Sequence, residues 1–360
     1  MLEIPRRISL PTQIAAAIRK GIEDGVWEEF LPGERRLCDL FQASRPTVRA
    51  ALHALAKDGW FEINQGRRNR IRSGVVRRDR GAPKRAVGII IHEPFDHLTP
   101  TLSQGLSEMR LQLAEQGFTT EVYVCPPHGT RVQKRGLESF IRQHRVFCCV
   151  LVSASRTVQS WFSDRSIPAL VLGSCHPAVK LPSLEVDYRA VCRHAAGIFL
   201  GKGHRHLALV IPDFGMAGDL ASEESFREAV EQQGEGRARA SLVRHNGTAP
   251  SIAAKLDALF DSGHPPTALL VARTQYVFIT ILYLLNRGLK VPDAVSLIAR
   301  DADLLFESLD PPLAHYSFQR DAYIRQLCRS MLQLLNERPA PKPILIVPKF
   351  LAGRTVLRIA

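Results

Sequence analysis

The chain has 360 residues, of which 45% are hydrophobic, and a formal net charge of +13. This length suggests two or three domains with ample hydrophobic cores. No apolar run approaches the roughly 20 residues that span a bilayer, and the N-terminus lacks a signal-peptide core, so we expect a cytoplasmic protein. The seven cysteines are scattered without a C-x-x-C pair, which argues against a disulfide framework and a zinc site.

The positive charge is concentrated near the N-terminus. Residues 1–85 hold 18 Lys and Arg against 10 Asp and Glu, so +8 of the net charge lies in under a quarter of the chain. Between Arg67 and Arg85, nine basic residues face a single acid, Asp79. Such a segment suggests a polyanionic partner, which is nucleic acid or an acidic membrane surface.

Three helical patterns and a hairpin pattern occupy residues 1–72. We expect helices at about 12–24 and 34–41 and a third that begins after Ser44, which is a good N-cap, and ends at Gly59. Only "QAS" separates the second helix from the third, as in a helix-turn-helix, whose second helix enters the major groove N-terminus first. The stretch "WFEINQGRRNRIRS" then predicts a β-hairpin wing.

Basic side chains lie at the beginning of the third helix, where the helix dipole disfavours them. Arg45 and Arg49 each cost a few tenths of a kcal/mol, up to about 1 kcal/mol, at this position. The cost makes sense if this helix end, with Thr47, meets phosphates and base edges. Taken alone, the charge pattern also fits a solvated basic face.

The stretch "LPGERRLCDLFQASRPTVRAALHALAKDGWFEINQGRRNRI" resembles the winged helix-turn-helix of GntR-type bacterial transcription regulators. The resemblance covers about residues 10–72 and implies double-stranded DNA as a partner. Together with the basic wing tip, it predicts that the DNA-binding residues are Arg35, Ser44, Arg45, Thr47, Arg49, Gln65, Gly66, Arg67 and Arg68.

Residues 73–85 form a basic flexible linker in this interpretation, and β-rich runs alternate with helical ones from residue 86. Strands are expected at 86–91, 119–125, 146–152, 168–173, 206–211, 240–244, 267–272 and 295–299, with helices at about 100–116, 131–143, 188–201, 221–233, 248–262, 274–287 and 320–336. This alternation predicts parallel sheets covered on both faces, with ligands beyond the carboxyl ends of the strands. The length of residues 86–360 favours two lobes with a cleft.

Motifs of catalysis are absent from the sequence. The stretch "GKGHRH" is not a phosphate-binding loop, "VGIII" is not followed by G-x-G-x-x-G, and neither H-E-x-x-H nor G-x-S-x-G occurs. His204 and His206 could share one strand face as metal ligands, but no third ligand has a suitable spacing. We therefore expect no cofactor, no metal and no enzyme. A cytoplasmic sugar-processing α/β enzyme with a basic N-terminal arm remains the alternative.

Two further stretches, "LEVDYRAVCRHAAGIFLGKGHRHLALV" and "PPTALLVARTQYVFITILYLLNRGLKVPDAVSLIARDADLLFESLDPPLAHY", resemble LacI/GalR-type effector domains. The resemblance implies a periplasmic-binding-protein type I fold, with a sugar-like effector between two lobes. Ser222 stands where many relatives have Arg, and Thr274 and Gln275 stand where they have Asn-Asp, which predicts fewer charge-assisted hydrogen bonds to a sugar. The expected effector-binding residues are His92, Glu93, Phe95, Ser222, Gln275, Asp301 and Phe318.

The sequence thus predicts a transcription regulator with a winged helix-turn-helix domain at 1–72, a linker at 73–85 and an effector-binding domain at 86–360. Repression relieved by a sugar is the default mode, and activation is the alternative. We expect a homodimer on a palindromic operator, because one winged helix reads only a few base pairs. The effector domain is expected to supply the dimer contact, since the helix in "VFITILYLLNRGL" is apolar on more than one side.

Overall fold

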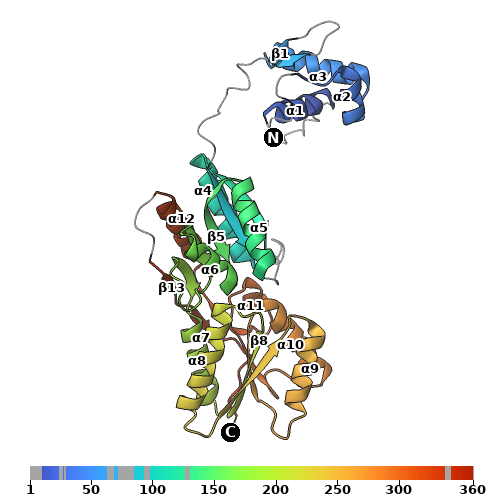
Figure 1. Ribbon diagram of the computed structural model, residues 1–360. Helices are drawn as coiled ribbons and strands as arrows, with labels where there is room; N and C mark the ends of the chain where they lie inside the picture. Colours follow the sequence, from blue (N-terminus) through green and yellow to red (C-terminus); the bar gives the residue numbers. More distant parts are fainter. Residues whose placement is uncertain are drawn as a thin grey trace. The chain divides into compact units, whose positions relative to one another are not determined.

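The structure is a computed structural model that describes residues 10–23, 27, 30–62, 69–71, 85–92, 98–125, 130–336 and 342–359. The chain divides into two compact units, residues 1–83 and residues 84–360 (Figure 1). Within the described residues, no helix is long and apolar enough to cross a membrane.

The first unit is a three-helix domain with a short hairpin. Helix α1 (Leu10–Glu23), α2 (Glu34–Phe41) and α3 (Arg45–Lys57) pack around a small core, and β1 (Phe61–Glu62) pairs antiparallel with β2 (Arg70–Ile71). The three predicted helices are confirmed, with α1 beginning two residues earlier than expected. The hairpin stem is confirmed as well, and the predicted wing tip lies outside the described residues.

Both ends of α3 follow from its sequence. The Ser44 Oγ accepts a hydrogen bond from the backbone N–H of Thr47 at 3.4 Å, and Pro46 occupies the first turn. At the other end Gly59 adopts a φ of 82°, which only glycine tolerates easily, and the N–H of Trp60 returns to the carbonyl of Leu55. These two caps fix where α3 begins and ends, and the Ser44 cap holds the end that carries the basic residues.

The second unit begins with a parallel sheet of six strands in the order β13-β7-β6-β5-β3-β4. We call this half the N lobe. Helices α4 and α12 cover one face of the sheet and α5 and α6 the other. Its elements are β3 (Ala86–Ile91), α4 (Pro100–Glu115), β4 (Thr119–Val124), α5 (Thr130–Gln143), β5 (Val146–Val152), α6 (Arg156–Asp164), β6 (Ala169–Leu172), β7 (Ser183–Val186), α12 (Arg320–Leu335) and β13 (Ile344–Ile346).

The C lobe holds a second six-stranded sheet in the order β14-β12-β11-β10-β8-β9, parallel except for β14. Helices α7 and α8 cover one face, and α9, α10 and α11 cover the other (Figure 1). Its elements are α7 (Tyr188–Gly201), β8 (His206–Pro212), α8 (Ala217–Gln233), β9 (Arg239–His245), α9 (Ala249–Phe260), β10 (Ala268–Val271), α10 (Thr274–Asn286), β11 (Ser296–Ala299), α11 (Leu304–Ser308), β12 (Ala314–Ser317) and β14 (Lys349–Leu351).

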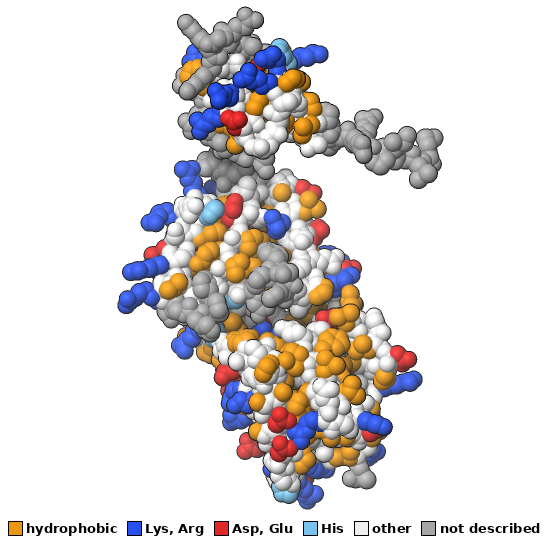
Figure 2. Space-filling model, turned by 90° about the vertical axis from the view of Figure 1, so that its right-hand side faces the viewer, with side chains coloured by type: hydrophobic (Ala, Val, Ile, Leu, Met, Phe, Trp, Pro, Cys, Tyr) orange, Lys and Arg blue, Asp and Glu red, His pale blue; other side chains and the backbone are white. Residues whose placement is uncertain are grey.

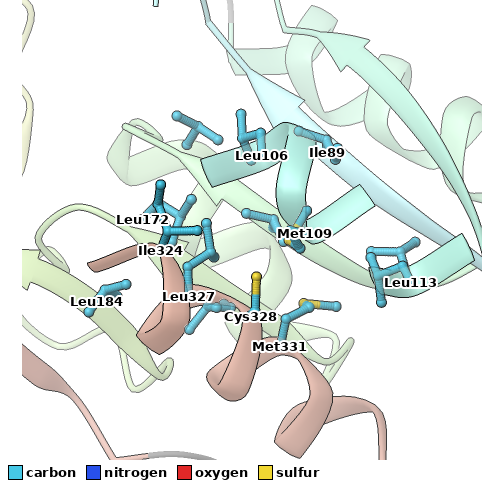
Figure 3. Close-up of a cluster of buried hydrophobic side chains, with 14 of the residues drawn as sticks. Ile89, Leu106, Met109, Leu113, Leu172, Leu184, Ile324, Leu327, Cys328 and Met331 are labelled. Atoms are coloured by element: carbon cyan, nitrogen blue, oxygen red, sulfur yellow. The ribbon is translucent and has the colours of Figure 1, made fainter. Parts of the chain in front are cut away.

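The chain crosses between the lobes three times, after β7, after β12 and after β13. The second crossing returns α12 to the N lobe, where its Ile324, Leu327 and Met331 pack against Leu106 and Met109 of α4 (Figure 3). Each lobe has a mainly parallel sheet with helices on both faces, which confirms the predicted fold class. The crossings hold the carboxyl ends of both sheets next to each other, and this is where a ligand site is expected.

Candidate functional site

The N-terminal ends of α2 and α3 present a group of exposed basic side chains. Arg35 lies in the first turn of α2, and Arg45 and Arg49 lie in the first two turns of α3. Figure 2 shows Lys and Arg side chains gathered on one face of this unit. The hydroxyl groups of Ser44 and Thr47 form a hydrogen bond of 2.7 Å at the beginning of α3. The structure thus places the five described residues of the predicted DNA surface on the beginnings of two neighbouring helices.

Glu34 is a partner of this surface that the sequence analysis did not identify. Its carboxylate accepts two hydrogen bonds from Arg49, at 3.1 Å from Nε and 2.9 Å from Nη2. These bonds lower the pKa of Glu34 and raise the pKa of Arg49. The pair ties the beginning of α2 to α3 and sets the direction of the Arg49 side chain. The sequence signal for Glu34 was an acidic residue at the N-terminus of α2, the helix that precedes the basic helix α3.

The rest of the predicted DNA surface belongs to the wing. Gln65, Gly66, Arg67 and Arg68 lie outside the described residues.

A cavity of about 190 Å³ lies between the lobes of the second unit, at the carboxyl ends of the strands. Both lobes contribute walls, including Leu98 and Thr99 before α4, Ser153 after β5 and Phe214 after β8. A neighbouring cavity of about 120 Å³ lies at the crossings and is lined by Phe318 among others. The two cavities share Thr99, Leu102, Ser153, Gly173, Tyr188, Arg300 and Asp301.

The predicted effector residues fall into three groups. His92, Gln275 and Asp301 line the larger cavity, and Phe318 lines the smaller one. Ser222 is fully buried, lines neither cavity and bonds to Arg300 instead. The last two residues of the set, Glu93 and Phe95, lie outside the described residues.

Arg300 is the centre of a buried charge network at the floor of the cavity. Its guanidinium, 2% exposed, donates to Asp219 at 2.8 Å, to Ser222 at 3.0 Å and to Asp301 at 3.1 Å. The ring of Tyr188 covers the guanidinium with its centroid 4.2 Å away. Burial and charge pairing of this kind make the arginine a fixed part of the site.

Asp301 is ionised and has its hydrogen-bonding capacity filled. It accepts from the hydroxyl of Tyr188 at 2.9 Å, from the backbone N–H of Arg273 at 2.7 Å and from Arg300. Burial raises the pKa of Asp301, but the charge of Arg300 and these hydrogen bonds lower it further, so the net shift is downward. Burial also raises the pKa of Tyr188, which keeps its hydroxyl protonated as a donor.

Arg273 brings a second guanidinium to the cavity. Its side chain is 22% exposed, contacts Asp219 at 3.3 Å and lies 5.6 Å from the ring centroid of Phe214. Its backbone has a φ of 65° and a ψ of 136°, a conformation that L-residues seldom adopt and that clusters at ligand sites. Arg273 also immediately precedes α10, whose N-terminus has no side-chain cap.

Two arginines lie beside the positions where the sequence predicts fewer charge-assisted hydrogen bonds to a sugar, and that prediction stays a prediction. Arg300, which follows β11, donates to Ser222 of α8 at 3.0 Å and directs its other hydrogen bonds to Asp219 and Asp301. The sequence signal for Arg300 was its place next to Asp301, a predicted effector-binding residue. Asp219, Tyr188 and Phe214 carried no comparable signal.

His204 and His206 have structural partners. His204 contacts the Thr267 hydroxyl at 2.9 Å and the carbonyl of Leu357 at 3.0 Å. His206 contacts Ser241 and the carbonyl of His264, each at 2.8 Å. Within the described part of the chain, no group of three or more His, Cys, Asp or Glu side chains is arranged to hold a metal.

Two family models match the chain. Residues 10–71 match the gntR family of bacterial regulatory proteins, and residues 196–356 match a periplasmic binding protein-like domain. The chain is 21% identical to the arabinose metabolism transcriptional repressor of Geobacillus stearothermophilus over 94% of this chain and 93% of the relative. It is 26% identical to the transcriptional regulator DegA of Bacillus subtilis over 42% of this chain and 44% of that protein.

Solved structures share the fold of the second unit. A LacI family regulator from Bifidobacterium animalis subsp. lactis superposes with a TM-score of 0.65 at 17% identity over 78% of this chain and all of that chain. The complex of the transcriptional regulator CelR with cellobiose has a TM-score of 0.64 at 16% identity, covering 97% of this chain and all of the other. The two lobes therefore have the fold of LacI-family effector domains.

Proposed function

We propose that this chain, which joins a DNA-binding domain of the gntR family to a periplasmic-binding-protein-like domain, is a transcription regulator that responds to a small sugar-like effector. One observation carries the proposal: the same chain has exposed basic side chains at the beginning of α3 and a cavity between two lobes. The first is suited to DNA and the second to a small ligand.

The relatives support both halves of the proposal. The arabinose repressor aligns along nearly the whole chain, and the CelR complex holds cellobiose, so a sugar or a sugar derivative is the favoured effector. Repression is the favoured mode, and the protein would act in the cytoplasm, where bacterial DNA lies. The named relatives are regulators, which favours a regulator over a sugar-processing enzyme.

Linkage connects the two sites in this proposal. The effector binds one arrangement of the lobes more tightly and shifts the population toward it, since only a differential affinity can move such an equilibrium. In a homodimer the shift changes the spacing of the two winged helices relative to a palindromic operator. The effector-binding residues would be His92, Gln275 and Phe318, with the carboxylate of Asp301 lining the cavity wall and Ser222 supporting Arg300.

DNA binding by the full chain is the first test. We expect gel-shift binding to a sequence selected from random DNA, with Arg45→Ala losing ~1–3 kcal/mol if Arg45 reads a guanine. Arg165→Ala is the matched control, because Arg165 is an exposed arginine of the N lobe that pairs with Glu138. Unchanged binding by the Arg45→Ala/Arg49→Ala double variant contradicts the DNA assignment. Turnover of a glycoside or sugar phosphate would instead favour the enzyme.

A further inference from the structure

We propose that the second unit binds the DNA backbone beside the operator through a row of basic side chains on the outer face of α5. We call this row the α5 stripe and define it as Arg131, Lys134, Arg135 and Arg142. The inference rests on the proposed function, because it requires the first unit to hold DNA. It goes beyond that function, since it gives the effector-binding unit a nucleic-acid surface of its own.

The four cations lie on one face of α5, opposite the face that packs on the sheet. The three arginines follow one another at steps of four and seven residues, so at 3.6 residues per turn they line up along the helix with Lys134 beside them. All four side chains are exposed, whereas Gln133, Leu137 and Phe140 on the other side are at most 6% exposed. The α5 stripe therefore points away from the lobe, on whose outside α5 lies (Figure 1).

The charge of the α5 stripe is not compensated nearby. The single acid of α5, Glu138, is already paired with Arg165 of α6 at 2.9 Å. Among the described residues, no ion pair joins a cation of the α5 stripe to an acid. With four basic residues and one acid, α5 has a net charge of +3, which equals that of α3 with three basic residues and no acid. Helix α8 of the C lobe, with one basic residue and five acids, has a net charge of −4.

The length of the α5 stripe suits an extended polyanion. Eleven positions separate Arg131 from Arg142, which corresponds to about 16 Å along the helix. Double-stranded DNA carries one negative charge per roughly 1.7 Å of its axis, so this length runs past about ten phosphates. A small anion would contact one or two of the four cations, whereas a duplex can contact all of them.

The course of the chain favours DNA as this polyanion. Strands β3 and β5 pair in parallel from Ala86 and Val146, so the chain enters the second unit at the end of the sheet where α5 finishes. Arg85 and Arg145 add two exposed cations there. The chain from Ile71 to Arg85 extends to at most about 50 Å, which gives DNA on the first unit a high effective concentration for the α5 stripe. An RNA or an acidic protein would have to be recruited from solution.

Duplex length is the variable of the test. At low salt, we expect the full chain to bind the selected sequence extended by about 15 base pairs on each side at least about fivefold more tightly than the minimal duplex. Arg131→Gln/Arg135→Gln/Arg142→Gln should lose this gain and bind the minimal duplex as wild type does. Each phosphate contact contributes about 0.9 to the slope of log K against log salt, so the slope on the long duplex should fall by about one to three.

The matched control is Arg227→Gln/Arg237→Gln/Lys255→Gln, which removes the same charge from three exposed positions of the C lobe. Extra duplex length also offers more sites to the first unit, but this gain is common to wild type and both variants. Hydroxyl-radical footprinting of the long duplex should show protected backbone outside the selected sequence in wild type and the control variant, and not in the α5 variant.

The outcomes separate this inference from the proposed function. An equal gain from the flanks in wild type and the α5 variant, or no gain in wild type, overturns the inference, while specific binding to the minimal duplex leaves the regulator intact. If labelled polyglutamate binds wild type and not the α5 variant while the flanks give no gain, the partner is an acidic protein and the DNA inference is wrong. Loss of specific binding to the minimal duplex by wild type would contradict the regulator instead.

Discussion

At the scale of single residues, the proposed DNA surface contains an ion pair, Glu34 with Arg49, in which the carboxylate would compete with DNA for the arginine. Arg49 is mostly exposed, with 59% of its side chain accessible, yet both its hydrogen bonds go to Glu34. A DNA phosphate that binds Arg49 must share its guanidinium with this carboxylate or displace the carboxylate. We infer that Glu34 orients Arg49 and also lowers the affinity for DNA of any sequence.

We therefore predict that Glu34→Gln strengthens non-specific DNA binding and weakens discrimination. Removing one negative charge at the interface should tighten the dissociation constant for random DNA about threefold at low salt, because exposed charge interactions are worth ~1 kcal/mol or less. Fluorescence anisotropy with random and selected DNA measures both values. Asp39→Asn, on the exposed side of the same helix, is the control. An unchanged affinity for random DNA argues against the competitor role.

His245 gives the C lobe a pH-dependent stability. Its ring is buried, its Nδ1 accepts the N–H of Gly247 at 3.1 Å, and a proton on Nδ1 would oppose that donor. Burial, helped by the charge of Arg273, lowers the pKa of His245 to about 4. The neutral form is thus favoured in the folded state, so its stabilising effect is full above the unfolded pKa of 6.5 and is lost as the pH falls toward 4.

We predict that this histidine removes about 2 kcal/mol of unfolding free energy between pH 7 and pH 5, since each pKa unit corresponds to ~1.4 kcal/mol. Urea denaturation at the two pH values measures the loss. His245→Gln retains an acceptor for Gly247 and should lose less stability over the same range. His144→Gln, at a half-exposed ring, is the control. If wild type and His245→Gln lose the same free energy, His245 is not the titrating group.

At the scale of elements, Arg300 fastens α7 and α8 to the end of β11. It reaches Asp219 and Ser222 of α8 and lies over Tyr188 at the beginning of α7. The same two helices are also joined by an exposed pair, Arg189 with Glu224 at 2.6 Å. The two ion pairs differ in burial and should differ in energetic weight.

We predict that Arg300→Met destabilises the second unit by ~3 kcal/mol or more, because it leaves buried carboxylates uncompensated. Arg189→Met, whose partner groups are 49% and 54% exposed, should cost less than ~1 kcal/mol. Thermal unfolding of both full-length variants gives the comparison. Similar losses for the two would mean that Arg300 is held by packing and not by charge.

The strands and helices that could be predicted from the sequence are those in which the apolar pattern is sustained over several residues. The eight predicted strands, such as 86–91 and 146–152, match observed ones because buried parallel strands read as continuous apolar runs. The strands β7 and β12 were missed because polar residues interrupt their four positions, and β13 and β14 because each has only three residues and is partly exposed. Helix α6 was also missed, although Ser155, Val158 and Trp161 gave a cap and an apolar spacing.

Residues of the interlobe cavity could be predicted only where the position of a single residue in the sequence indicated its place. Asp301, Gln275 and His92 follow strands, and strand ends meet at the cleft, so their place in the cavity could be inferred. The network around Arg300 could not, because it joins side chains more than seventy positions apart in sequence, such as Arg300 and Asp219. Both residues lie in the C lobe, so such contacts depend on how the sheet and helices of that lobe pack together and not on local periodicity.

At the scale of the whole molecule, the described α10 has more apolar surface than its own lobe covers. Val277 and Leu284 are fully buried against the sheet, whereas Leu282 and Leu285 are 59% and 67% exposed. Figure 2 shows hydrophobic side chains on the face of the C lobe that carries α9 and α10. This surface is our candidate for the homodimer contact that a palindromic operator requires.

We predict that the full chain is a dimer at micromolar concentration and that Leu282→Glu/Leu285→Glu shifts it to monomer. Each leucine buried at a two-fold interface contributes ~1.5–3 kcal/mol and occurs twice, so the double substitution should weaken association at least a hundredfold. Sedimentation velocity measures the change. Leu111→Glu, at a leucine of α4 that is 58% exposed, should leave the dimer intact. If the α10 variant stays dimeric while Leu111→Glu dissociates, the contact lies on the N lobe, and a monomeric wild type would contradict the dimer itself.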